Sequence, residues 1–232
     1  GHRIVEVNRG DRRSRRQNGK SDTLDAEAAA RSVLAGTATS IPKTADGLSE
    51  MIRQIKVARD TARKGRTSAI ICLKTIVVNA PAELRESLDG LPDKALIDRC
   101  AGFRPRSMAT TVDSAKHSLR ALARRWLDLD AEIRTHDAVL DDLTAQASPT
   151  LRDGYGIGPD TAAEILIVFG DNPDRIRSEA AFAKLCGTCP IPASSGLTNK
   201  HRLYRGGHRQ ANAALYRTVI VRMRFHQPTI DY

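Results

Sequence analysis

The chain has 232 residues, enough for one large or two small domains, and its 37 Lys and Arg against 27 Asp and Glu give a net charge of +10, which points to a polyanionic partner. Its longest apolar runs are far too short to span a bilayer and no glycine period exists, so membrane and fibrous proteins are excluded. Four cysteines do not make a disulfide framework in a chain of this length, which favours a reducing, cytoplasmic setting, and 4% aromatic residues disfavour a reader of single-stranded bases.

The first twenty residues combine a short β-prone run, Ile4–Val7, with a basic loop. They hold seven Lys or Arg and two acidic residues. The chain begins with Gly1 rather than Met and has no apolar signal segment, so we expect a fragment or a processed chain. Contacts to nucleic-acid phosphates are predicted for four arginines of the loop: Arg12, Arg13, Arg15 and Arg16.

An alanine-rich helix is predicted to open at Ser21 and to end at Gly36. Asp22 and Asp25 are three residues apart near its positive end, so both carboxylates project from one face and could share a divalent metal ion. Asp is also common in first helical turns because it caps them, and capping is therefore the alternative interpretation.

Two long helices with heptad-like patterns are predicted next. The first covers 46–79 and has small residues at its middle, which imply close approach of another helix. The second covers 112–147, where apolar residues alternate spacings of three and four. The pair can form an antiparallel hairpin within the chain or associate with a second protomer. Short helices joined by turns are predicted for 80–110.

The last part of the chain, 149–232, is one-sidedly basic. No acidic residue lies between Ala180 and Ile230. The same stretch contains eight basic residues: Lys184, Lys200, Arg202, Arg205, Arg209, Arg217, Arg222 and Arg224. We therefore expect many of the phosphate contacts here.

A glycine-rich segment, 151–163, resembles the helix-hairpin-helix DNA-binding motif through the run Gly156-Ile157-Gly158-Pro159 and Thr161. Backbone N–H groups of such a turn, with the N-terminus of the following helix, hold a phosphate without reading sequence. Gly156, Gly158 and Thr161 are therefore predicted to bind nucleic acid. The alternative is that the glycines only make a tight turn between helices.

A turn at Ser194, Ser195 and Gly196 precedes a dense basic cluster. A serine that attacks a phosphodiester needs such surroundings, because cations neutralise the charge that develops on the phosphate oxygens. The expected phosphate-binding residues of the cluster are Lys200, Arg202, Arg205 and Arg209. A plain Ser-Gly turn is the alternative.

The pair Cys186 and Cys189 has the spacing of half a zinc site or of a redox pair. No second pair with this spacing follows, so buried or incidental thiols are the expectation.

Several of these blocks occur in an order that resembles insertion-sequence-110 type transposases, the bridge-RNA-guided recombinases. The resemblance covers essentially the whole chain. It rests on the runs 19–26, 80–85 (Ala-Pro-Ala-Glu-Leu-Arg), Gly-Ile-Gly-Pro, Ser195-Gly196 and 205–212 (Arg-Gly-Gly-His-Arg-Gln-Ala-Asn).

The resemblance implies a mainly α chain with three parts. Residues 1–40 correspond to the C-terminal remnant of an α/β RuvC-like (RNase H-like) domain, and 41–148 to a coiled-coil helical arm. Residues 149–232 correspond to a helical C-terminal transposase domain that contains the helix-hairpin-helix.

The same resemblance implies the chemistry. Ser195 matches the nucleophile, with Ser194 as the neighbour that could be confused with it, and Asp22 and Asp25 match the last two acids of a DEDD tetrad that binds Mg²⁺. The implied partners are DNA, a structured noncoding guide RNA and further copies of the chain, as a dimer or tetramer, in the bacterial cytoplasm at the nucleoid. The other two tetrad acids would precede Gly1, so we expect the 232-residue chain alone to bind nucleic acid without recombining it.

The leading hypothesis is therefore a DNA recombinase that combines a serine nucleophile with a metal site. Two alternatives stay open: a non-catalytic nucleic-acid-binding remnant, and a metal-dependent junction nuclease in which Ser195 is dispensable. A protein–DNA adduct that depends on Ser195 separates the first hypothesis from both others.

Overall fold

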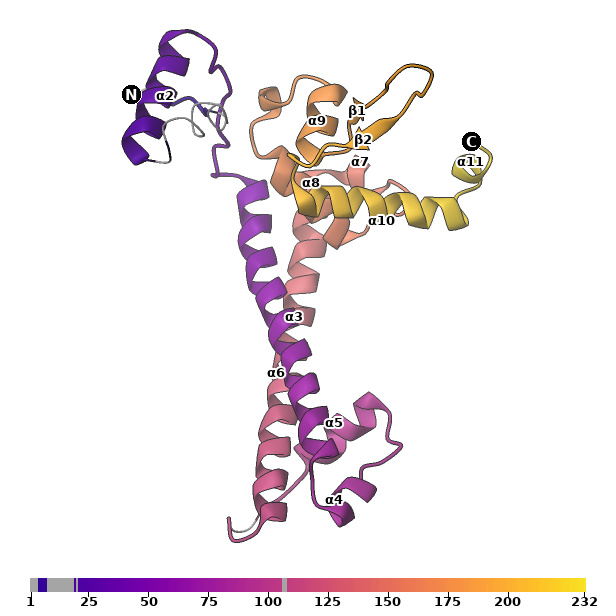
Figure 1. Ribbon diagram of the computed structural model, residues 1–232. Helices are drawn as coiled ribbons and strands as arrows, with labels where there is room; N and C mark the ends of the chain where they lie inside the picture. Colours follow the sequence, from indigo (N-terminus) through magenta and orange to yellow (C-terminus); the bar gives the residue numbers. More distant parts are fainter. Residues whose placement is uncertain (1–3, 8–18, 20, 106–107) are drawn as a thin grey trace. The chain divides into compact units, whose positions relative to one another are not determined.

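The computed structural model describes residues 4–7, 19, 21–105 and 108–232. The arginines predicted to bind phosphate near the N-terminus, Arg12, Arg13, Arg15 and Arg16, lie outside the described residues. The described chain is mainly helical and carries one two-stranded sheet (Figure 1), which confirms the mainly α prediction. It divides into two compact units, 51–163 and the combination of 1–50 with 164–232.

Two long helices make up most of the unit 51–163. Helix α3 spans Leu48–Val78 and α6 spans Thr111–Ala147, within two residues of the predicted bounds. They run side by side in opposite directions (Figure 1), since Arg66 pairs with Asp130 and Arg59 pairs further along with Asp137. The two helices therefore fold back on each other within one chain.

The predicted close approach of the two helices occurs at Gly65. A Cβ atom added at Gly65 would lie 3.2 Å from Leu129 Cδ1, which leaves almost no room for a side chain. The guanidinium of the next residue, Arg66, stacks over the Trp126 ring at 5.4 Å from its centroid, and cation–π contacts of this kind stabilise a helix pair modestly.

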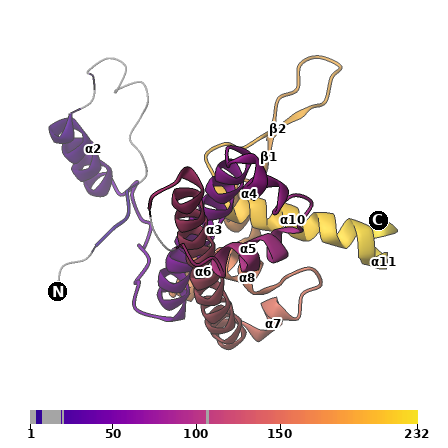
Figure 2. The same cartoon turned by 90° about the horizontal axis from the view of Figure 1, so that it is seen from below.

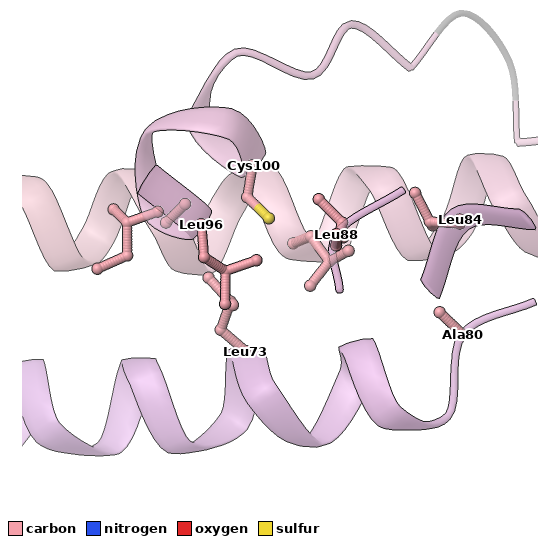
Figure 3. Close-up of a cluster of buried hydrophobic side chains, with 9 residues drawn as sticks. Leu73, Ala80, Leu84, Leu88, Leu96 and Cys100 are labelled. Carbon is pink, nitrogen blue, oxygen red and sulfur yellow. The ribbon is translucent and has the colours of Figure 1, made fainter. Parts of the chain in front are cut away.

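The end of the α3–α6 pair is covered by two short helices, α4 at Ala82–Glu86 and α5 at Asp93–Ala101. Helix α5 lies against α6 (Figure 2). Figure 3 shows the resulting core, in which side chains from all four helices meet and Leu73, Ile97 and Leu119 are fully buried. Burying one such aliphatic side chain contributes about 1.5–3 kcal/mol, so this cluster holds the four helices together.

Helix α2, Asp22–Leu34, belongs to the other unit and has the predicted ends. The Ser21 hydroxyl accepts a hydrogen bond from the Leu24 N–H at 3.3 Å, which satisfies one of the free donors of the first turn. Gly36 follows the helix with a φ of +67°, a conformation that glycine adopts without strain. Before α2, Glu6 forms a single antiparallel bridge with Ser40.

The C-terminal elements begin with α7, Pro149–Arg152, and α8, Pro159–Phe169, followed by the 3₁₀ turn Pro173–Arg175 and by α9, Glu179–Cys186. Strands β1, Pro190–Pro192, and β2, His201–Leu203, form the sheet. Helices α10, Arg209–Phe225, and α11, Gln227–Ile230, complete the chain. A small core of Val168, Cys186 and Ala211 joins α8, α9 and α10.

The stretch before α3 is attached to the corner after α8 by polar contacts. Asp171 accepts hydrogen bonds from the backbone N–H groups of Ser49 (2.7 Å) and Gly47 (3.3 Å), and so caps α3 from a distant part of the chain. The Asn172 amide donates to the Pro42 carbonyl at 2.7 Å, and Lys43 donates to the carbonyl of Ile167. Both ends of the described chain thus contribute to one unit.

None of the described helices is long and apolar enough to cross a membrane. The predicted RuvC-like remnant and helix-hairpin-helix remain predictions.

Candidate functional site

The predicted nucleophile lies in a β-hairpin that joins α9 to α10. Strands β1 and β2 pair antiparallel with Ile191 opposite Arg202, and the same register continues to a bridge between Ser195 and Thr198. Gly196 and Leu197 form the two-residue turn between them, with Gly196 at a φ of +55°. Glycine at the first position of a two-residue turn is what a type II′ hairpin requires, because only glycine adopts that φ freely.

The register places the serine and two cations on one face of the hairpin. Alternate residues of a strand point to opposite faces, and directly paired residues share a face. Since Ser195 pairs with Thr198 and Arg202 pairs with Ile191, residues Ser195, Lys200 and Arg202 share one face. Ser194 and Asn199 share the other face. The sequence alone gave no means of sorting these residues by face.

The two neighbouring serines have different surroundings. The Ser194 hydroxyl donates to Asn199 Oδ1 at 3.0 Å and accepts from the Lys200 N–H at 3.3 Å, so it helps to hold the hairpin closed. No hydrogen bond to the Ser195 hydroxyl is found among residues 4–7, 19, 21–105 and 108–232, and Ser195 is exposed. Ser195 is therefore the serine whose hydroxyl is available to a ligand.

Four exposed cations lie on the hairpin and in the segment that follows it. The exposed side chains of Lys200, Arg202, Arg205 and Arg209 form no ion pair within the part of the chain that the structure describes. Three cations of α3 differ, since Lys56, Arg59 and Arg66 are each bound to carboxylates. The hairpin and the segment that follows it thus present four exposed cations, whose positive charge favours a polyanion.

Residues 207–212, which follow β2, contact the chain just before the hairpin; we call these contacts the hairpin clasp. Gly187 and Gly207 touch backbone to backbone, because a Cβ atom added at Gly207 would lie 2.2 Å from the Gly187 nitrogen. The Asn212 amide donates to the carbonyls of Cys186 (3.2 Å) and Gly187 (3.3 Å), and His208 Nδ1 accepts from the Ala211 N–H at 3.3 Å. These contacts hold the base of the hairpin against α9 and α10.

The cysteine pair does not form a disulfide. All four cysteines are free, and Cys186 is buried in the small core beside α10. Burial raises the pKa of the Cys186 thiol, which disfavours the thiolate that metal binding and redox chemistry require. The expectation of a buried thiol is confirmed for Cys186.

The predicted phosphate-binding turn connects α7 to α8. Gly156 has a φ of +78°, and open space surrounds the Cα of Gly158, so a ligand could approach its backbone closely. The Ile157 N–H donates to the Gly154 carbonyl at 3.0 Å, which closes the turn. Thr161 is buried, so its side chain offers little surface to a ligand. The prediction of phosphate binding rests here on the two glycines.

A buried cluster of charged side chains holds the start of α8 within the unit 51–163. Asp160 accepts from Lys56 Nζ at 2.7 Å and from an Arg59 terminal nitrogen at 2.8 Å, and both cations are buried. Burial is the largest single influence on the pKa of Arg59, and it lowers that pKa. The hydrogen bond to Asp137 and the nearby negative charges of Asp160, Asp137 and Asp60 raise it by more in total. The net shift of the Arg59 pKa is therefore upward. The glycine turn is thereby tied to α3.

Asp22 and Asp25 both lie in the first turn of α2, Asp22 exposed and Asp25 half-buried. Across the described residues, no group of three or more His, Cys, Asp or Glu side chains is arranged to hold a metal ion. Mg²⁺ is commonly held by only one or two carboxylates together with water and substrate phosphates, so two aspartates suit it in residue type and number. The structure places this pair on α2 and the serine on the hairpin.

An exposed serine on a hairpin with exposed cations is suited to binding a phosphate. Residues 149–232, which include both features, match the family model described as the IS116/IS110/IS902 transposase family. No curated protein matches the chain significantly. The family match supports a transposase of the insertion-sequence-110 type, and with it a DNA-binding function.

Two features of the site escaped sequence reasoning. The charge cluster escaped it because Asp160 lies about a hundred residues from its partners, although the spacing of Lys56, Arg59 and Asp60 already places three charges on one helix face. The position of Leu197 at the tip of a turn also escaped it, and a large apolar residue among turn-forming residues was the available signal.

Proposed function

We propose that the chain is a DNA transposase in which Ser195 attacks the scissile phosphate. The observation that carries this proposal is the free, exposed Ser195 hydroxyl on the same hairpin face as Lys200 and Arg202, inside the segment that matches the transposase family. Ser194 is the weaker candidate, because its hydroxyl is engaged with Asn199 and Lys200.

In the proposed step, Ser195 Oγ forms a bond to phosphorus and loses its proton, and the bond from phosphorus to one sugar oxygen breaks. The released sugar oxygen takes up a proton, and the DNA strand stays attached through a phosphoserine. Lys200, Arg202, Arg205 and Arg209 bind the non-bridging oxygens and the flanking phosphates, where they offset the charge of the transition state. A sugar hydroxyl of another strand then attacks the phosphorus and loses its proton; the bond from phosphorus to Ser195 Oγ breaks, the serine takes up a proton, and the DNA is rejoined.

Asp22 and Asp25 are the proposed Mg²⁺ ligands. Bound Mg²⁺ would supply neutralising charge to a DNA phosphate. The role of the two carboxylates is to hold that charge on the exposed side of α2.

Further partners belong to the same proposal. The turn at Gly156 and Gly158 binds a DNA phosphate through its backbone, as in a helix-hairpin-helix. A structured guide RNA supplies sequence recognition, in keeping with a chain that is rich in Arg and has few aromatic residues. The chain acts as a homo-oligomer at the nucleoid in the cytoplasm, and the exposed apolar side chains of Tyr216, Val219 and Met223 on α10 support self-association.

The test is a search for the phosphoserine linkage. The full chain, purified with its bound RNA, is incubated with Mg²⁺ and supercoiled DNA, denatured, digested with nuclease and analysed by mass spectrometry for a nucleotide attached to the peptide that contains Ser195. We expect the adduct in the wild type and its absence in Ser195→Ala.

Thr198→Ala is the matched control, because it removes another exposed hydroxyl beside the same turn and leaves the backbone hydrogen bonds between Ser195 and Thr198 in place. It should retain the adduct. An adduct that persists in Ser195→Ala would refute the assignment of the nucleophile. DNA cleavage that requires Asp22 but yields no adduct would favour the metal-dependent nuclease, and DNA binding without cleavage or adduct would favour the non-catalytic remnant.

A further inference from the structure

Leu197 has no role in holding the hairpin together. It occupies the second position of the two-residue turn, next to Gly196, and its exposed fraction is 108%, so it contacts no core. Residues at such positions are usually Gly, Asn, Asp or Ser, which favour the turn by their own conformation or hydrogen bonds. A fully exposed leucine there needs an explanation other than folding.

The surroundings of Leu197 indicate the chemistry of its partner. It is separated from Ser195 by a single residue, and the hairpin that carries it has the exposed cations Lys200 and Arg202. No acidic residue occurs from Ala180 to Ile230. An apolar tip within positive charge fits a duplex nucleic acid, which presents phosphates outside and apolar base faces inside.

We propose that Leu197 is a wedge that inserts between stacked bases of duplex DNA beside the phosphate attacked by Ser195. The proposal rests on the proposed function and deepens it. Leu is among the apolar residues that proteins insert between base steps, where it unstacks them and kinks the duplex. Unstacking at the cut site helps the strands to separate for exchange.

The dimensions of the hairpin agree with this role. Two residues span at most about 7 Å, or about two base-pair rises, and less through a turn, so Ser195 and Leu197 can reach neighbouring nucleotides. Proteins place β-ribbons in the major or the minor groove of B-form DNA, and apolar wedges enter the base stack from the minor groove. The tip of the β1–β2 hairpin extends away from α9 and α10 in both orientations (Figures 1 and 2), which leaves the turn accessible.

The test compares two DNA duplexes of the same sequence, one of them with a single-nucleotide bulge, at one salt concentration. The bulge has already lost the stacking that a wedge must break, so the wild-type full chain should bind it at least about fivefold more tightly. In Leu197→Ala this ratio should fall to about one, while affinity for the perfect duplex changes less than about threefold. Leu197→Met, which keeps an apolar side chain of similar size, should keep the ratio.

Leu203→Ala is the matched control, because Leu203 is also exposed, at 62%, but lies in β2 away from the turn. It should behave as the wild type. A 2-aminopurine placed next to the bulge should gain fluorescence with the wild type and not with Leu197→Ala.

Several outcomes would overturn the wedge. These are a wild-type ratio near one, an unchanged ratio in Leu197→Ala, an equal loss in Leu203→Ala, or a preference confined to bulged RNA duplexes. DNA binding without preference for the bulge refutes the wedge alone. Failure of the wild type to bind any DNA refutes the proposed function as well.

Discussion

Replacement of Asp160 by Ala tests whether the buried charge cluster stabilises the helical unit. Asp160 is the shared acceptor of Lys56 and Arg59, at 2.7 and 2.8 Å. The side chains of the two cations are only 7% and 10% exposed, so water cannot replace the lost carboxylate fully. The variant should therefore unfold more easily than the wild type.

The expected loss follows from the geometry of the cluster. Removing one partner of a buried ion pair typically costs about 3–5 kcal/mol. Two features reduce this figure here. The Asp160 side chain is 35% exposed, and each cation keeps another carboxylate, Asp60 at 3.2 Å from Lys56 and Asp137 at 2.5 Å from Arg59. We expect a loss of about 2 kcal/mol in the free energy of unfolding.

Asp93→Ala provides the control. Asp93 pairs with Lys74 at the same distance, 2.7 Å, and also lies in the first turn of a helix, but its side chain is 64% exposed. Exposed pairs contribute about 0.2–1 kcal/mol, and loss of an acidic residue from a first turn costs a few tenths more. The total for Asp93→Ala should therefore stay below about 1 kcal/mol.

The measurement is urea unfolding of the full chain, followed by circular dichroism at the wavelength of the helical signal. With a slope of about 2 kcal/mol per molar urea, Asp160→Ala should lower the midpoint by about 1 M and Asp93→Ala by less than half of that. Equal shifts for the two variants would refute the argument that burial makes the Asp160 cluster important.

Two further predictions concern Cys100 and the hairpin clasp. Burial raises the pKa of Cys100 from 9.0 to about 11, so its neutral thiol stabilises the fold fully below pH 9, and up to about 2.5 kcal/mol of that stability is lost as the pH rises through 11. Between pH 8 and 11 the free energy of unfolding should fall less steeply with pH in Cys100→Ala than in the wild type, and identical slopes of the two plots would contradict this. Gly207→Ala would force a Cβ to within 2.2 Å of the Gly187 nitrogen, so it should destabilise the clasp by about 2 kcal/mol or more and increase proteolysis of the hairpin. Gly158→Ala is the control, because a Cβ atom at Gly158 would meet no other atom within 4 Å, and it should leave proteolysis of the hairpin unchanged.

Local features of the fold were predictable because they depend on residues close in sequence. The heptad pattern located α3 and α6 to within two residues, and Ser21 and Gly36 marked the ends of α2. Small residues in the first long helix indicated a close helix contact, which Gly65 makes with Leu129. Such signals arise from interactions three or four residues apart, which the sequence states directly.

The candidate site was only partly predictable for the same reason. A Ser-Gly turn within basic residues located the hairpin, but the pairing register decides that Ser195 shares a face with Lys200 while Ser194 bonds to Asn199. Composition located the positive charge. Whether a cation has a carboxylate partner depends on which distant elements meet.

By itself, then, the sequence determined a basic, mainly helical chain with long heptad helices and a serine turn among arginines. The tertiary structure decided which of those residues are engaged: Asp160 binds Lys56 and Arg59, while Ser195 and Leu197 stay exposed at the tip of the hairpin. The physical reason is that periodicity and capping are local, whereas burial and ion pairing depend on contacts between residues as far as a hundred positions apart.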